Sequence, residues 1–258
     1  MKIKLILLLG LLSVLNSYGQ SDVDKKFDIK KIKVNPKFDY TQVKDSTIFR
    51  GLAVNMIWNE KYDKAIYFLE QELAINPKNV YAIHLIGYVL SESGFPEKSL
   101  IYFKKATEMI PDDYTFHYNY GLAYYRLKNY QKAIEEYSKT IKINPTDSFA
   151  FYNRALAYEE IRDFKSAIND YNTDLTINGE QARIFNNRGR CYMLLNDYEQ
   201  ALNDYNKALE IEPAKANTLG NRGILYIRMG QIDKACPDLY KATELGDDQT
   251  FLINKYCK

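Results

Sequence analysis

The sequence is poor in the residues from which most metal and nucleophilic sites are built. It has two histidines and three cysteines in 258 residues, and neither histidine has a second His or Cys at metal-ligand spacing. No HExxH, G-x-S-x-G or phosphate-binding glycine loop is present. We therefore expect a protein that is not an enzyme, with no catalytic residue, no metal and no cofactor.

Long apolar runs are also absent, except at the N-terminus. Lys2 and Lys4 precede the run Leu5–Leu15, and small residues follow before Gln20. A basic start, an apolar middle and a small-residue cleavage site are typical of a secretory signal peptide, here residues 1–19. The run is too short for a bilayer, which needs about 20 residues; an uncleaved membrane anchor is the alternative. We expect an exported protein, periplasmic or secreted, with no integral membrane segment after cleavage.

The chain lacks an excess of charge of either sign. It has 35 basic and 33 acidic residues, and cleavage after residue 19 would remove two lysines and leave the numbers equal. A neutral chain gives no electrostatic reason to expect nucleic acid or an anionic membrane as a partner. We expect a protein or peptide ligand as the partner, and self-association is possible.

What the sequence does contain is a repeat of 34 residues. The segment QKAIEEYSKTIKINP (131–145) resembles EQALNDYNKALEIEP (199–213), and the two lie 68 residues apart, twice 34. A frame of 34 residues gives six repeats without an insertion, numbered 1 to 6 below: 46–79, 80–113, 114–147, 148–181, 182–215 and 216–249.

The repeat has the residue pattern of two packed helices. Position 8 is always Gly or Ala, position 20 is small, and position 24 is large and apolar or aromatic. Positions 4, 7, 8 and 11 share one helix face, and positions 17, 20, 24 and 27 share another. Turn residues such as Lys128 and Asn129 lie between them, and proline at position 32 ends the second helix in four repeats. One pair cannot bury these faces alone, so the repeats must stack.

This pattern resembles the tetratricopeptide repeat family, in an exported bacterial form, over residues 46–249. The resemblance implies an all-α fold, a right-handed superhelical solenoid of tandem antiparallel helix pairs. Glu72 and Asp174 depart from the family pattern at position 27, where a small residue is usual, and Gly179 and Asp247 replace the proline. These departures affect local packing and not the predicted fold.

The two ends of the chain do not fit the frame. Residues 20–45 form a lysine-rich leader, and an alternative is that its apolar residues fold back as a cap. Residues 250–258 are expected to form a C-terminal capping segment. Export implies an oxidising compartment, so we hypothesise a Cys236–Cys257 disulfide; two unconnected buried thiols are the alternative. Pro237 is expected to delay or kink its helix, and Cys191 is interpreted as a packed thiol.

A possible binding surface lies on the other side of the first helix, at positions 2, 5, 6, 9, 12 and 13. The family resemblance implies that these positions line a concave groove, and that asparagines at position 6 hold a peptide backbone. Those asparagines are Asn119, Asn153, Asn187 and Asn221. The alternative is that each amide bonds to a neighbouring helix or to water. Flanking candidates for peptide binding are Tyr118, Tyr125, Tyr152, Asn186, Arg190 and Arg228, with Leu122, Leu156, Met193, Ile224 and Ile227 between them.

Other polar residues receive structural interpretations. Arginine at position 7 and aspartate at position 23 recur together in repeats 4 to 6, which favours charge pairs between helices or between adjacent repeats. His117 takes the place of a phenylalanine in other repeats and is interpreted as a packing histidine. The paired acids Glu135-Glu136 and Glu159-Glu160 are expected to be exposed helix charge.

These observations leave three hypotheses for function. The first is a non-catalytic scaffold or adaptor of the cell envelope or secreted space, which binds an extended peptide or protein loop in the groove. The second is a structural subunit of an envelope assembly that uses convex faces and solenoid ends. The third, an envelope hydrolase with an unrecognised acidic site, has no positive support in the sequence.

Overall fold

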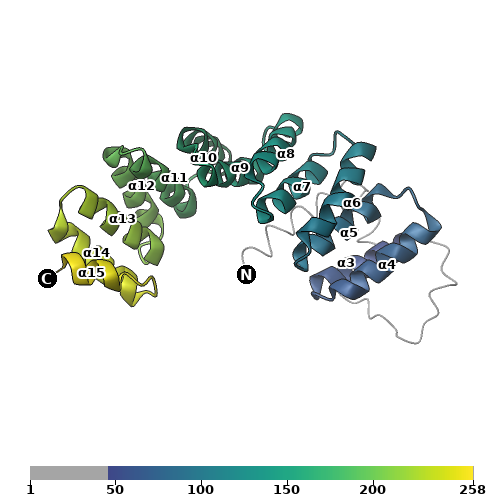
Figure 1. The fold of residues 1–258 in the computed structure, drawn as a ribbon, viewed down its shortest axis with the longest axis horizontal. Coiled ribbons are helices and arrows are strands. Elements are labelled where there is room, and N and C mark those ends of the chain that lie inside the picture. Colours follow the sequence, from purple (N-terminus) through teal and green to yellow (C-terminus); the bar gives the residue numbers. More distant parts are fainter. Residues whose placement is uncertain (1–45, 258) are drawn as a thin grey trace. The chain divides into compact units, whose positions relative to one another are not determined.

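The computed structural model describes residues 46–257, which contain helices and no strand. The predicted signal peptide, the leader and Lys258 lie outside the described residues. In each repeat the first helix begins at position 1 and the second at position 17 (Figure 1). The all-α fold of tandem antiparallel helix pairs is therefore confirmed. The helices are α3 (Ser46–Trp58), α4 (Tyr62–Ile75), α5 (Val80–Glu92), α6 (Pro96–Met109), α7 (Tyr114–Arg126), α8 (Tyr130–Ile143), α9 (Ser148–Glu160), α10 (Phe164–Asn178), α11 (Ala182–Leu194), α12 (Tyr198–Ile211), α13 (Ala216–Arg228), α14 (Ile232–Glu244) and α15 (Thr250–Tyr256).

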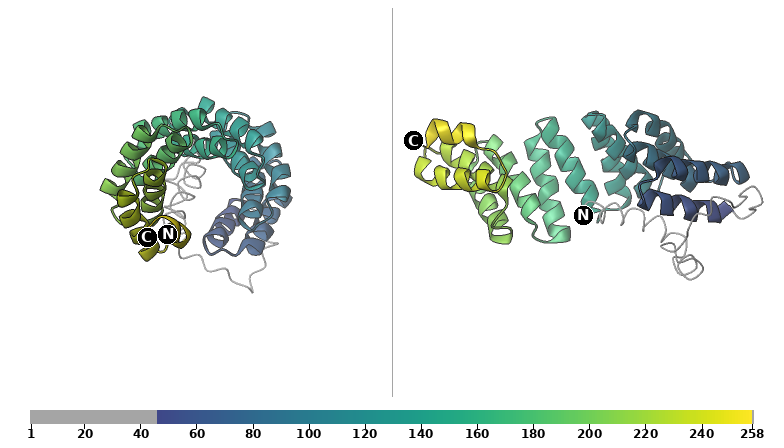
Figure 2. Two further views of the ribbon diagram at one scale, coloured as in Figure 1. Left: turned by 60° about the vertical axis from the view of Figure 1, so that its left-hand side comes forward. Right: turned by 90° about the horizontal axis from the view of Figure 1, so that it is seen from below.

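These helices form two compact units. The first ends at Pro145 and includes α3 to α8, and the second runs from Thr146 and includes α9 to α15. Within each unit every helix packs against the next along the chain, and the paired helices lie side by side in both views of Figure 2. Each unit thus buries its apolar faces by stacking three repeats.

The core of each repeat is a close contact between position 8 and position 24. A methyl group on Gly121 would lie 2.7 Å from Cε1 of Tyr137, and one on Gly223 would lie 2.7 Å from Cδ2 of Leu239. The position-24 side chains are at most 1% exposed in all six repeats. The predicted roles of the small and large residues are confirmed: the two helices pack at a distance that leaves room for at most a small side chain.

The turn between the two helices has the same geometry in every repeat. Position 15 has a positive φ in all six: Glu60, Gly94, Lys128, Arg162, Asn196 and Gly230. The N–H of the next residue donates to the carbonyl of position 11, as from Asn129 to Tyr124 at 2.9 Å. This left-handed ending closes the first helix. The next residue then caps the second helix in repeats 3 to 5, where the Asn129, Asp163 and Asp197 side chains accept backbone N–H groups.

The two acids at position 27 are buried with partners. Glu72 is fully buried, lies 3.0 Å from the guanidinium of Arg50, and accepts a hydrogen bond from Asn79 at 2.6 Å. Asp174 is fully buried and accepts from Asn178 at 2.9 Å. Burial raises the pKa of Asp174 to about 6. The departures from the family pattern are therefore accommodated locally, without loss of a helix.

Bidentate ion pairs join the two helices in repeats 4 to 6. In each pair the arginine Nε and Nη2 atoms donate to the two carboxylate oxygens at 2.6–2.9 Å: Arg154–Asp170, Arg188–Asp204 and Arg222–Asp238. Arg188 also donates from Nη1 to Asn172 in the preceding repeat, at 2.6 Å. The predicted structural role of these residues is confirmed, because each arginine neutralises a buried acid of its own repeat.

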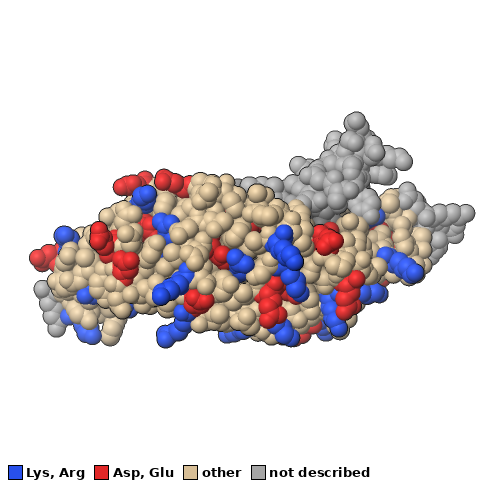
Figure 3. Space-filling model, turned by 90° about the horizontal axis from the view of Figure 1, so that it is seen from above, with Lys and Arg blue, Asp and Glu red and all other residues tan. Residues whose placement is uncertain are grey.

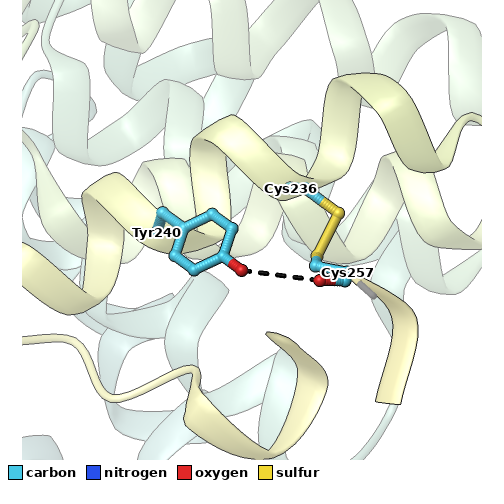
Figure 4. Close-up of a disulfide and its surroundings, with 3 residues drawn as sticks. All are labelled: Cys236, Tyr240 and Cys257. Carbon is cyan, nitrogen blue, oxygen red and sulfur yellow. Dashed lines mark hydrogen bonds between the residues drawn. A yellow bond between two sulfur atoms is a disulfide. The ribbon is translucent and has the colours of Figure 1, made fainter. Parts of the chain in front are cut away.

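A disulfide links the C-terminal segment, which contains α15, to the last repeat. In α15 no residue is fully buried, and a disulfide joins Cys236 of α14 to Cys257, with Cα atoms 5.6 Å apart (Figure 4). The Tyr240 hydroxyl lies 3.5 Å from the Cys257 carbonyl oxygen. The expected delay of α14 by Pro237 is wrong: α14 begins at Ile232, position 17, as in the other repeats, and continues through the proline. The exposed position of Pro237 leaves its ring free of core contacts.

We expect Arg188→Met to lower the free energy of unfolding by about 3 kcal/mol, because it leaves the carboxylate of Asp204 buried without its partner. Asp204 is 1% exposed. Chemical denaturation followed by circular dichroism measures the change. In the double variant Arg188→Met/Asp204→Leu much of the loss should be recovered, since no unpaired charge remains. An unchanged midpoint for the single variant would contradict a stabilising pair.

We expect replacement of both Cys236 and Cys257 by serine to destabilise the C-terminal end by about 3 kcal/mol, the value for a loop of this length. The two cysteines are 21 residues apart in sequence. A reducing agent should lower the denaturation midpoint of the natural chain and should leave the midpoint of the variant unchanged. Alkylation of the denatured, unreduced chain should label Cys191 alone; labelling of all three cysteines would exclude the disulfide.

Candidate functional site

The asparagines at position 6 connect neighbouring repeats. We call the surface formed by positions 2, 5, 6, 9, 12 and 13 of the first helices the A-helix face. Three of the four amides donate from Nδ2 to the position-5 side chain of the preceding repeat: Asn119 to His84 Nε2 at 3.0 Å, Asn187 to the Tyr152 hydroxyl at 3.2 Å, and Asn221 to Asn186 Oδ1 at 3.0 Å. The structure therefore shows that the amides help to hold the repeats in register, and peptide binding by them stays a prediction.

In the first unit, the A-helix face contains a buried histidine, His84, at position 5. Burial lowers the pKa of His84 to about 3, so the ring is neutral and its Nε2 can accept the hydrogen bond from Asn119. The rings of Tyr118 and Tyr125 are half-buried. Tyr118 lies 5.9 Å from the ring of Tyr137, between centroids, and Tyr125 makes an edge contact with Tyr130 at 5.4 Å.

In the second unit, four polar side chains form a continuous chain of hydrogen bonds, which we call the amide relay. Asn221 donates to Asn186, Asn186 donates to Asn187 at 3.2 Å, and Asn187 donates to Tyr152. The relay crosses repeats 4, 5 and 6. Asn153 instead donates to the Phe149 carbonyl of its own helix at 2.9 Å. The relay fixes the orientation of amide groups that are still half-exposed, except for the buried Asn186.

An ion pair lies beside the relay. Arg190 donates from Nη2 to Glu159 Oε2 at 2.5 Å, and Glu159 Oε1 accepts from the buried Tyr171 hydroxyl at 2.5 Å. The guanidinium of Arg183 lies 4.6 Å from the centre of the Tyr152 ring, a cation–π contact. Arg228 is exposed and makes no hydrogen bond or ion pair within residues 46–257.

The expectation of exposed paired acids is wrong for one member of each pair. Glu136 is 7% exposed and Glu159 is 8% exposed, whereas Glu135 and Glu160 are exposed. Glu136 is at position 23, the position of the paired aspartates in repeats 4 to 6, and Glu159 is at position 12 of the A-helix face. The 34-residue frame, read at these positions, was the signal that distinguishes the members of each pair.

His117 is a packing histidine, as predicted. It is 6% exposed, with Nδ1 at 2.6 Å from Glu136 Oε2 and Nε2 at 2.9 Å from the Pro111 carbonyl oxygen. Lys139 also donates to Glu136, at 2.7 Å. His117 contributes to an open pocket of about 620 Å³ in the first unit, whose lining mixes acids and lysines: Thr107, Glu108, Pro111, Asp112, Lys139, Lys142 and Ile143.

Cys191 is a packed thiol, as predicted. It is fully buried, and burial together with the nearby Glu159 carboxylate raises the pKa of the thiol far above its ordinary value. Residues 46–257 contain no group of three or more His, Cys, Asp or Glu placed to hold a metal ion. In the same residues, no helix combines the length and apolar character needed to span a bilayer. On the face drawn in Figure 3, basic side chains lie among acidic ones.

The sequence did not identify Arg183, Glu159 or Tyr205 as members of the A-helix face or its floor. Arg183 is at position 2, which the helical arithmetic places on this face, but no other repeat has a charge there. The position-24 tyrosines are predicted as core residues. The hydroxyl of one of them, Tyr171, reaches a residue of the A-helix face, since it donates to Glu159.

Three solved structures share this fold at low sequence identity. PilF of Pseudomonas aeruginosa is 18% identical, with a TM-score of 0.68, over 81% of this chain and 97% of that one. YrrB, described as a TPR protein with an unusual peptide-binding site, is 19% identical with a TM-score of 0.64, over 74% and 98%. MamA is 24% identical with a TM-score of 0.61, over 66% and 93%. No curated protein sequence matches closely enough to indicate a relative.

Family models described as tetratricopeptide repeat match the chain at residues 80–113, 114–147, 136–169, 182–214 and 204–236. Together the matches cover more than half of the sequence. Three of them coincide with repeats 2, 3 and 5, and the other two each run from the second helix of one repeat through the first helix of the next. The chain belongs to the tetratricopeptide repeat family.

Proposed function

We propose that this protein is a non-catalytic interaction scaffold that binds an extended peptide, or a loop of another protein, on the A-helix face of its second unit. The observation that carries the proposal is the amide relay. Side-chain amides donate and accept at once, so they can pair with the backbone of a peptide of any sequence. The three amides of the relay lie in repeats 5 and 6, and the Tyr152 hydroxyl continues the row into repeat 4.

The relay leaves binding capacity unused. The side-chain oxygen Oδ1 of Asn221 accepts no hydrogen bond from the described residues, and the second side-chain N–H of Asn187 has no partner among them. Because the relay already holds these groups in place, a ligand does not have to order them, and less entropy is lost on binding. The half-exposed amides on the relay are therefore suited to a backbone that runs along the face.

The surroundings of the relay suit the side chains of a ligand. Ile224 and Ile227 are half-buried on α13, Leu194 is 38% exposed at the end of α11, and the charged ends of Arg190 and Arg228 border them. A mixed surface of apolar and cationic groups around fixed polar groups is typical of protein and peptide contacts. The description of YrrB as having a peptide-binding site supports this use of the fold.

We propose further that the protein acts after export, in the cell envelope or the secreted space. Two features support this location: the signal-like N-terminal sequence and the Cys236–Cys257 disulfide, since disulfides persist in oxidising compartments.

The test is selection of random eight-residue peptides, displayed on phage, against the full chain. We expect Asn187→Ala/Asn221→Ala to weaken selected peptides by about tenfold to a hundredfold, because each lost amide contact costs about 0.5–1.5 kcal/mol. Binding is measured by calorimetry with synthetic peptides, after circular dichroism has shown an intact helical fold.

The matched control is Asn169→Ala, which removes an exposed amide from the second helix of repeat 4. It should leave the affinity unchanged. Equal affinity of the double variant and the natural chain would assign the relay a purely structural role and move the proposed site elsewhere.

A further inference from the structure

In the second unit, two tyrosines at position 24 differ in one respect: the hydroxyl of Tyr171 has a carboxylate partner, and that of Tyr205 has no partner among the described residues. In repeat 4, the hydroxyl of Tyr171 at position 24 donates to the carboxylate of Glu159 at position 12. The other oxygen of that carboxylate pairs with Arg190 from repeat 5. A carboxylate thus satisfies a buried hydroxyl below it and a cation beside it.

Repeat 5 has the hydroxyl without the carboxylate. Tyr205, at position 24, is fully buried, and its hydroxyl has no hydrogen-bond partner among the described residues. The residue at position 12 is Met193, which packs in the same hydrophobic cluster and offers no carboxylate. Buried hydroxyl groups are nearly always paired, so an unpaired one marks a place where an acceptor is missing.

The position equivalent to Arg190 in repeat 6 holds Ile224, and the cation that acts on the Tyr205 hydroxyl from this repeat is Arg228, at position 13. An arginine at the same position in the first unit, Arg126, shows what such a residue reaches: it donates to Ser91 at 2.7 Å and pairs with Glu92, positions 12 and 13 of the preceding repeat. For Arg228 the equivalent residues are Met193 and Leu194, which are apolar. This explains why the exposed guanidinium of Arg228 has no acid partner within the second unit.

The positive charges of Arg190 and Arg228 both influence the ionisation of the Tyr205 hydroxyl. Burial raises the pKa of Tyr205, and the Asp204 carboxylate acts in the same direction, while the positive charges of Arg190 and Arg228 act in the opposite direction. Asp204 is already paired with Arg188. Arg190 in turn is paired with Glu159. Of the three arginines Arg188, Arg190 and Arg228, only Arg228 has no carboxylate partner among the described residues.

We propose that this place binds the side-chain carboxylate of an aspartate or glutamate in the bound peptide, which accepts from the Tyr205 hydroxyl and pairs with Arg228. The inference rests on the proposed function and adds a sequence requirement to it. Glu159 in repeat 4 shows that a carboxylate can accept from a position-24 tyrosine hydroxyl and from an arginine at the same time. The proposal requires the flexible, unbranched side chain of Met193, which packs in the same cluster as Tyr205, to move when the acid binds.

The experiment uses the same phage library of random eight-residue peptides. Peptides selected on the natural chain should have an acid at one fixed position, and a synthetic peptide with Glu there should bind about tenfold to a hundredfold more tightly than its Gln twin, as expected for a hydrogen-bonded charge pair. Arg228→Gln and Tyr205→Phe should each reduce this ratio. Met193→Glu should remove the preference, because it supplies the missing carboxylate from within the chain.

Tyr137→Phe is the matched control. It removes a second buried hydroxyl that has no partner among the described residues, in the first unit, and it should leave the preference unchanged. Selected peptides without a preferred acid, or a Glu-to-Gln ratio unaffected by Arg228→Gln and Met193→Glu, would overturn the inference and leave the scaffold proposal standing. If the natural chain selects no peptide at all, the proposed function and the inference both fail.

Discussion

The close approach of two helices at position 8 is the constraint on which the rest of the structure depends. Opposite it, position 24 holds a large side chain that is almost fully buried, and glycine or alanine is all that fits between the backbones. Ala155 against Tyr171 shows that one methyl group can be accommodated. Because every repeat is built on this contact and on the same left-handed turn at position 15, all the repeats have the same internal register.

That constancy gives each surface position a fixed set of neighbours. Position 7 meets position 23 in repeats 4 to 6, and within a unit position 6 can meet position 5 of the preceding repeat, and position 13 can meet positions 12 and 13 of the preceding repeat. When one repeat has a different residue at such a position, the contact that is lost can be identified by comparison with the other repeats. Where repeat 4 has Glu159, repeat 5 has Met193, and the Tyr205 hydroxyl has no acceptor among the described residues. The candidate site follows from such differences between otherwise equivalent repeats.

Much of the fold could be predicted from the sequence, because the 34-residue period fixes helix starts, turns and core positions together. The ion pairs were predictable too, since Arg188 and Asp204 recur with their equivalents in adjacent repeats. The turn at Lys128 was predicted but not its positive φ, because four of the six residues there are not glycine. The continuation of α14 through Pro237 was missed, because helix packing outweighs the loss of one hydrogen bond.

The candidate site was predictable only in part. Position 6 was identified, but whether its amides bond to the protein or to a ligand depends on distances that a sequence does not contain. Glu159 appeared to be ordinary surface charge, since helical periodicity gives the direction of a side chain and not the depth at which its carboxylate lies. The unpaired hydroxyl of Tyr205 could be found only by following three-dimensional contacts.

The most direct test of the shared register is a pair of glycine substitutions compared in chemical denaturation. Gly121→Val should lower the free energy of unfolding by about 1–3 kcal/mol, because the added atoms meet the buried ring of Tyr137, whereas a Cβ on Gly51 meets no described atom within 4 Å. Gly51→Val should leave stability unchanged or slightly raised, because glycine is the poorer helix former. Equal effects of the two substitutions would contradict the claim that the contact at position 8 sets the packing of each repeat.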